Sequence, residues 1–124
     1  QHTLAGVELP ILPRRGFILV TEPLPVMVRH KVYAADYVAN VASDNAGLET
    51  SAVIEGTMSG TVLIGASRER VGFDKTLDWA VVRRLARQAI EIFPFLADVQ
   101  LLRTYGGFRP YCPDHLPVIG RDAR

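Results

Sequence analysis

One long amphipathic segment, residues 76–93, constrains the fold of this chain most. Apolar residues recur along it every four positions: Val81, Leu85, Ala89 and Phe93. This spacing predicts a helix with one apolar side. Thr76 is placed to cap its first turn, and Pro94 ends it because proline donates no backbone hydrogen bond. With a single helix, the regular alternation of strands and helices in a doubly wound parallel sheet is excluded.

Short β-branched and aromatic runs bounded by glycine and proline predict the strands. These runs are residues 17–21, 37–43, 50–55, 61–66 and 99–105. A five-residue connection, Gly56 to Gly60, joins the third run to the fourth and predicts a hairpin. The segment Val62-Leu63-Ile64 is expected in the core. Four or five strands with one helix predict an α+β fold.

Composition restricts the classes of function. The chain has 124 residues, the size of one domain, and its 14 Lys+Arg and 13 Asp+Glu residues give a net charge of +1. No broad field is therefore present to hold nucleic acid or an anionic membrane. No apolar run reaches the roughly 20 residues of a membrane span, and no signal peptide opens the chain. A single cysteine, Cys112, fits a reducing compartment, and a start at Gln1 without methionine suggests a piece of a longer protein.

Residues 105–120 hold the densest cluster of chemically informative residues. Two glycines before Arg109 allow close approach to the backbone, and flanking prolines favour a rigid loop. A guanidinium held in this way can bind a carboxylate through two parallel hydrogen bonds. The alternative is a structural ion pair with Asp114 or another neighbouring acid. Phosphate-binding glycine motifs and paired metal-ligand motifs are not found in the sequence, so the chain has no visible anchor of its own for a cofactor.

Three blocks of sequence resemble one family. Gly107-Phe108-Arg109-Pro110, followed by Pro113-Asp114-x-Leu116-Pro117-Val118-Ile119-Gly120, is similar to the distal signature of FAD-dependent amine and amino-acid oxidoreductases. That family includes glycine oxidase, D-amino-acid oxidase and sarcosine oxidase. Residues 15–22 and 62–74 resemble the same family in the same order. The likeness is greatest to flavin subunits related to hydrogen cyanide synthase and opine oxidase.

The resemblance implies a fold and an organisation. Residues 1–124 would form a single substrate-binding domain, with a mixed, mainly antiparallel sheet and the main helix packed on one face. The FAD-binding Rossmann half is absent from the sequence. We therefore expect FAD to bind the full-length parent and not to be retained by this fragment, which would be inactive alone.

The resemblance also implies roles for individual residues. Arg109 matches the arginine that binds the substrate carboxylate, which orients the α-carbon hydrogen toward the flavin. Tyr111 and Tyr37 are candidates for the pocket wall, since phenols combine an apolar ring with a hydroxyl group. Gly107 and Pro113 are candidates for contact with the cofactor. No catalytic side-chain base and no metal ligand are expected.

The resemblance also bears on Cys112 and on two charged residues, Arg68 and Asp74. The attachment position for a covalent flavin falls near Gly107, so Cys112 is expected to be a free thiol. Arg68 and Asp74 are expected to pair with each other or to shape the turn around Gly72.

The expected function is oxidation of the carbon–nitrogen bond of a small amino or imino acid to an imine, by hydride transfer to FAD. The alternative is a non-catalytic ligand-binding or subunit-interface module that lacks flavin. Expected partners are the amino or imino acid, the FAD-binding half of the same chain and other oxidoreductase subunits, without nucleic acid or a membrane span. The expected location is cytoplasmic, with membrane association only through partner subunits.

Overall fold

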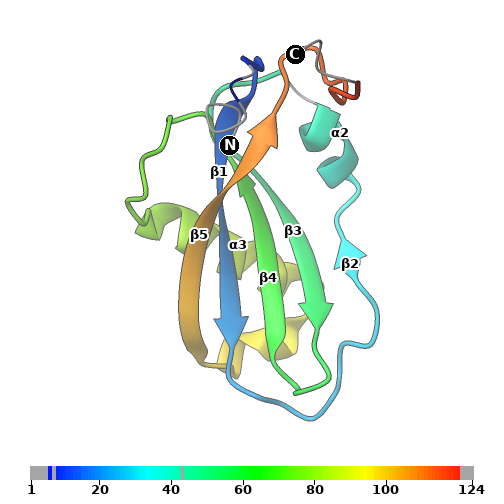
Figure 1. Cartoon of the computed structure of the whole chain (residues 1–124). Coiled ribbons are helices and arrows are strands. Elements are labelled where there is room, and N and C mark those ends of the chain that lie inside the picture. Colours follow the sequence, from blue (N-terminus) through cyan, green and yellow to red (C-terminus); the bar gives the residue numbers. More distant parts are fainter. Residues whose placement is uncertain (1–5, 7, 43, 121–124) are drawn as a thin grey trace.

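The computed structural model describes residue 6, residues 8–42 and residues 44–120. Its strands form one five-stranded sheet in the order β2-β3-β4-β1-β5, and each neighbouring pair is antiparallel (Figure 1). The strands are β1 (Leu12–Thr21), β2 (Val32–Tyr33), β3 (Glu49–Gly56), β4 (Val62–Arg68) and β5 (Leu101–Tyr111). The helices are α2 (Asp36–Ala42), α3 (Trp79–Ile92) and the 3-10 helix η1 (Pro94–Asp98). The predicted α+β class and antiparallel sheet are confirmed.

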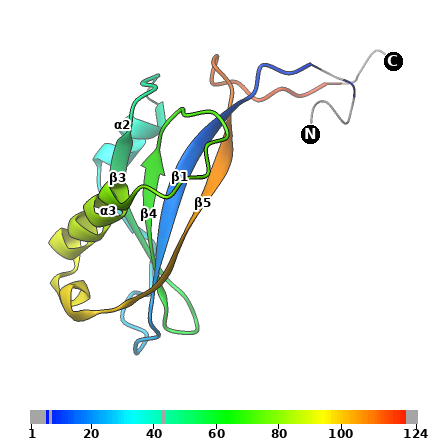
Figure 2. The same cartoon turned by 90° about the vertical axis from the view of Figure 1, so that its left-hand side faces the viewer.

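Helix α3 covers one face of the sheet (Figure 2). Its predicted apolar side is buried: Val81, Val82, Leu85 and Ala89. These side chains join one hydrophobic core with residues of the strands, including Phe17, Leu19, Ile54, Val62 and Ile64. Each buried Val, Leu, Ile or Phe side chain of this core contributes roughly 1.5–3 kcal/mol through the hydrophobic effect. The predicted hairpin and the core positions of Val62 and Ile64 are confirmed, whereas Leu63 is half-buried.

Helix α3 begins later than the sequence predicts. Asp78, not Thr76, is its N-cap, and the Asp78 side chain accepts hydrogen bonds from the backbone N–H groups of Ala80 and Val81. The reason is a tertiary contact upstream. The carbonyl of Thr76 accepts a hydrogen bond from Arg15, which holds this segment against β1 and outside the helix.

The strand predicted over residues 37–43 is wrong. Residues 36–42 form helix α2, with Asp36 in its first turn, and Ser43 lies outside the described residues. The upstream segment Val32–Tyr33 pairs with β3 instead, so β2 already occupies the sheet edge that this run would need. The ring of Tyr37 then packs beside Tyr33 and beneath the guanidinium of Arg68.

Strand β5 runs further than predicted. It continues through Gly106 and Gly107 to Tyr111, because β1 is paired with it along its length, including Gly16 opposite Gly107 and Arg14 opposite Arg109. Arg109 therefore lies on a strand, and the expectation of a rigid loop around it is wrong. Within the described part of the chain, no helix is long and apolar enough to cross a membrane.

Candidate functional site

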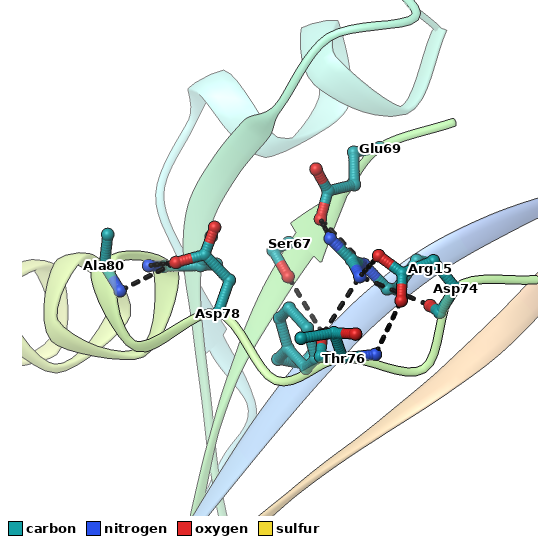
Figure 3. Close-up of polar contacts among 9 residues, drawn as sticks. Arg15, Ser67, Glu69, Asp74, Thr76, Asp78 and Ala80 are labelled. Atoms are coloured by element: carbon teal, nitrogen blue, oxygen red, sulfur yellow. Dashed lines mark hydrogen bonds and ion pairs between the residues drawn. The ribbon is translucent and has the colours of Figure 1, made fainter. Parts of the chain in front are cut away.

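Successive residues of β1 point to opposite faces of the sheet, and this separates two buried arginines. Arg15 lies on the α3 side (Figure 3). Its Nη2 lies 2.6 Å from Glu69 Oε1, and its Nη1 lies 2.9 Å from Asp74 Oδ2 and 3.0 Å from the Thr76 carbonyl. Hydrogen bonds from Thr76, and then the charge of Arg15, lower the pKa of Asp74. Asp74 thus pairs with Arg15, not with Arg68, and this cluster fixes the segment that leads into α3.

Arg14 points to the other side, into a pocket of about 440 Å³. The lining residues come from β1, α2, β4, β5 and the segment that follows β5. Figure 1 shows α2 and this segment at the same end of the sheet. The lining of the pocket includes Arg14, Tyr37, Arg68, Arg109, Tyr111 and His115. The structure therefore brings the three predicted substrate-binding residues Arg109, Tyr111 and Tyr37 together, although they are far apart in the sequence.

Arg109 crosses β1 to reach β4. Its Nη1 donates a hydrogen bond to the carbonyl of Ser67 at 3.0 Å, and the residue remains exposed. The guanidinium lies over Gly16, where a built Cβ would come within 2.5 Å of Nη1. Asp114 instead accepts a hydrogen bond from the backbone of Leu116, and no carboxylate of the described residues forms an ion pair with Arg109. The alternative of a structural Arg109–Asp114 pair is therefore wrong.

Arg68 is a second cation of this pocket, and the sequence did not predict that role. It is only 4% exposed, and its guanidinium lies 4.5 Å from the ring centroid of Tyr37. Burial, followed by the neighbouring charges of Arg109 and Arg14, lowers the pKa of Arg68. An arginine that follows the apolar run of β4 is the signal that could have identified it, because such a position is rarely charged.

Arg14 is the third cation. Its Nη2 lies 3.1 Å from Oε2 of Glu49, where Arg14 is buried and Glu49 partly buried, and its guanidinium lies 5.3 Å from the ring centroid of Tyr111. The Glu49 carboxylate balances Arg14. Arg68 and Arg109 therefore supply the uncompensated positive charge of the pocket.

Tyr111 closes one side of the pocket and is tied to a small polar cluster. Its hydroxyl donates to Oδ1 of Asp44 at 3.0 Å, and Nε2 of His115 lies 2.7 Å from the same oxygen. The hydrogen bonds from His115 and then Tyr111 lower the pKa of Asp44, while burial and the bond to Asp44 raise the pKa of Tyr111. Because the Tyr111 hydroxyl is already hydrogen-bonded to Asp44, Tyr111 contributes its aromatic ring to the wall of the pocket.

Gly107 and Pro113 lie on either side of Arg109 along the chain. A Cβ built on Gly107 would meet no heavy atom within 4 Å, so its exposed backbone borders open space. Pro113 is exposed in a turn that the hydrogen bond from the His115 N–H to the Cys112 carbonyl closes at 2.9 Å. Cys112 forms no disulfide in the described part of the chain.

An antiparallel sheet with a helix on one face and an arginine-rich pocket at its end defines an α+β domain suited to binding small anions. Residues 1–124 match the family model described as FAD dependent oxidoreductase, and the chain belongs to this family.

Named relatives agree with this assignment. The chain is 34% identical to the hydrogen cyanide synthase subunit HcnC of Pseudomonas protegens, over 93% of this chain and 24% of that protein. It is 32% identical to a glycine oxidase of Pseudomonas aeruginosa, over 93% of this chain and 28% of that protein. The fold is similar to that of the L-proline dehydrogenase of P. horikoshii, with a TM-score of 0.78 and 23% identity over 98% of this chain and 30% of that one. The chain thus spans about a quarter of the length of these curated relatives.

Proposed function

We propose that residues 1–124 are the substrate-binding domain of a longer FAD-dependent oxidoreductase that oxidises the carbon–nitrogen bond of a small amino or imino acid to an imine. The observation that carries the proposal is the position of Arg109. In a chain of this family, the arginine that matches the carboxylate-binding motif lies exposed in a pocket walled by Tyr37 and Tyr111.

Arg109 would bind the substrate carboxylate. Its Nη1 is held by the Ser67 carbonyl, so one edge of the guanidinium is fixed while the residue stays exposed to the pocket. A planar guanidinium fixed in this way orients a carboxylate, and orientation lowers the barrier to reaction at the adjacent carbon. The rings of Tyr37 and Tyr111 would limit the size of the substrate.

FAD would be held mainly by the other half of the protein, and the residues of this chain fit a contact with it. The bare backbone of Gly107 faces open space close to the Arg109 strand position, so a flat ring system can approach it without a clash. Pro113 is the second proposed contact. When bound, FAD supplies the acceptor of a hydride from the α-carbon, and the nitrogen loses a proton as the imine forms. No side chain of this chain is proposed as the base.

Other subunits are further proposed partners. The relative HcnC is by its name one subunit of a hydrogen cyanide synthase. A free cysteine is consistent with the proposed cytoplasmic location, and we propose that any membrane association occurs through partner subunits.

The test uses the full-length parent. Its flavin absorption should bleach under anaerobic conditions with one of glycine, sarcosine, proline, D-amino acids or opines. Arg109→Ala should retain the flavin and raise the KM for that substrate roughly 10- to 100-fold, the effect of losing a charged hydrogen bond. Arg84→Ala is the matched control, because it removes the same charge from the exposed side of α3.

Two results would contradict the proposal. A parent that purifies without flavin would support the alternative, a non-catalytic ligand-binding or interface module. Equal kinetics in the Arg109→Ala and Arg84→Ala variants would remove Arg109 from substrate binding.

A further inference from the structure

Arg68 is the most unusual buried group in the pocket. The residue is only 4% exposed, yet its buried Nη1 has no hydrogen-bond partner among the described residues. Arginine stays charged in proteins, so it cannot lower this cost by losing its proton. A buried charged donor without an acceptor is unfavourable unless a ligand supplies the acceptor.

Glu49 lies opposite Arg68 in the β3–β4 register, but its carboxylate forms its ion pair with Arg14 and not with Arg68. Ion pairs among the described residues involve Arg14, Arg15, Lys31 and His115, and none of them includes Arg68 or Arg109. The described lining residues of the pocket include no aspartate or glutamate. Two guanidinium groups in one pocket therefore repel each other until anions bind.

The position of Arg68 separates its role from that of Arg109. Arg109 approaches from β5 and is held by the Ser67 carbonyl, whereas Arg68 ends β4 and lies against the ring of Tyr37 on α2. The guanidinium of Arg68 lies 4.5 Å from the ring centroid of Tyr37, and the residue lines the same pocket as Arg109, so both cations border the space that a ligand would enter. A carboxylate bound at Arg109 does not occupy Arg68, so the guanidinium of Arg68 can bind a second carboxylate.

We propose that Arg68 binds a second carboxylate of the substrate, so that the pocket selects amines carrying two carboxylates over amines carrying one. The inference rests on the proposed function for the identity of the first carboxylate site at Arg109. The second carboxylate has two chemical sources, a carboxyalkyl group on the nitrogen or the side chain of an amino acid. Both present the same paired anions to Arg109 and Arg68.

Binding of unreactive acids tests this on the full-length, flavin-loaded parent, independently of turnover. Thiodiacetate and (methylthio)acetate differ only in the second carboxylate, and neither contains an amine to be oxidised. Titration calorimetry should show thiodiacetate binding at least roughly tenfold more tightly, the effect of one charged hydrogen bond. Succinate against propanoate is the parallel pair for a side-chain carboxylate. A preference in either pair supports the proposal and tells the two sources apart, and no preference in both pairs overturns it.

Two variants assign the effect to residues. Arg68→Met removes the charge but keeps an unbranched apolar stem, and it should abolish the diacid preference while weakening the diacid far more than the monoacid. Arg109→Ala should weaken both acids, since it removes the shared site. If Arg68→Met weakens monoacid and diacid equally, or releases the flavin, then Arg68 is structural and the proposal is wrong.

Kinetics separate this inference from the proposed function. With iminodiacetate and sarcosine as substrates, Arg68→Met should lower kcat/KM for iminodiacetate roughly 10- to 100-fold more than it lowers kcat/KM for sarcosine. If neither amine bleaches the flavin but the diacid preference persists, the proposed oxidation is refuted while the proposed diacid site is supported. If sarcosine is oxidised and no diacid is preferred, the diacid site is wrong while the oxidation stands.

Discussion

The guanidinium of Arg109 lies over the backbone of Gly16, so that a Cβ on Gly16 would stand 2.5 Å from Nη1 of Arg109 and 2.5 Å from the Ser67 carbonyl oxygen. The absence of a side chain at Gly16 is therefore what lets Arg109 cross β1 and bond to β4. The geometry of the pocket depends on a residue that has no functional group of its own.

Gly16→Ala should consequently disturb both the sheet and the pocket. The added methyl group meets a backbone oxygen that cannot move freely, and such overpacking costs about 1–3 kcal/mol of unfolding free energy. Urea unfolding of the 124-residue chain measures this loss. In the full-length parent, the same variant should raise the KM of the substrate, because Arg109 is displaced.

Gly107→Ala is the matched substitution one strand away, opposite Gly16 in the β1–β5 register. Its Cβ would enter open space, so we expect no loss of stability in the same urea experiment. In the full-length parent, the methyl group should weaken flavin binding, which is measured as flavin content after dialysis. Unchanged flavin content would remove Gly107 from the proposed cofactor contact.

Arg15→Met tests the cluster on the opposite face. The substitution leaves the mostly buried Glu69 without its cation and releases the segment before α3, so the free energy of unfolding should fall by about 3–5 kcal/mol. The Lys31–Glu55 pair is a useful contrast, because both side chains are about half exposed. Lys31→Met should leave the urea midpoint nearly unchanged, since exposed ion pairs contribute little. A similar loss in the two variants would contradict this ranking.

The helix cap gives a prediction that separates the sequence-based expectation from the structure. Asp78→Ala removes the acceptor for the Ala80 and Val81 N–H groups and should cost about 0.5–2 kcal/mol. Thr76→Ala should cost less, since the Thr76 side chain does not cap α3 and its backbone groups, which bond to Arg15 and Asp74, remain in the variant. Thermal unfolding followed by circular dichroism measures the loss of stability in each variant. A larger loss in Thr76→Ala than in Asp78→Ala would show that Thr76 is the N-cap of α3.

Acid should destabilise the chain through Asp44. Its pKa is lowered from 3.8, so its hydrogen bonds stabilise the fold above that pH, and the contribution disappears as the pH falls through the lowered value. Asp44→Asn should therefore reduce the difference between urea midpoints measured at pH 6 and pH 3. Part of the difference should remain, because Asp74 also has a lowered pKa.

Carboxyl NMR titration checks the causes directly. Removing His115 should raise the pKa of Asp44 more than Tyr111→Phe does, because the His115 hydrogen bond is the larger contribution. The reverse order would show that the Tyr111 hydroxyl dominates this cluster.

Local patterns of sequence predicted the parts of the fold that depend on neighbouring residues. The four-residue spacing from Val81 to Phe93 predicts α3, and the glycine-bounded connection predicts the β3–β4 hairpin. The motif around Arg109 likewise identified the family, which the comparison with known proteins confirms over residues 1–124. Helical periodicity, turn residues and motif spacing are all local properties, so they are visible in the sequence.

The wrong predictions concern elements whose structure depends on contacts with segments far away in the sequence. Residues 36–42 form a helix because β2 takes the edge of β3, and β5 passes through two glycines because β1 pairs with it throughout. The helix α3 starts at Trp79 because Arg15, far upstream, holds Thr76.

The sequence by itself determined the α+β class, the position of the main helix and the family motif that contains Arg109. Only the tertiary structure decided that Arg109, Arg68 and Tyr37 share one pocket, and that the buried Nη1 of Arg68 has no partner among the described residues. The physical reason is that sheet pairing and packing bring together segments that are far apart in the sequence, such as Arg14 opposite Arg109 in the β1–β5 register and Asp44 beside His115. A charge is costly or useful according to what surrounds it, and those surroundings exist only in the folded chain.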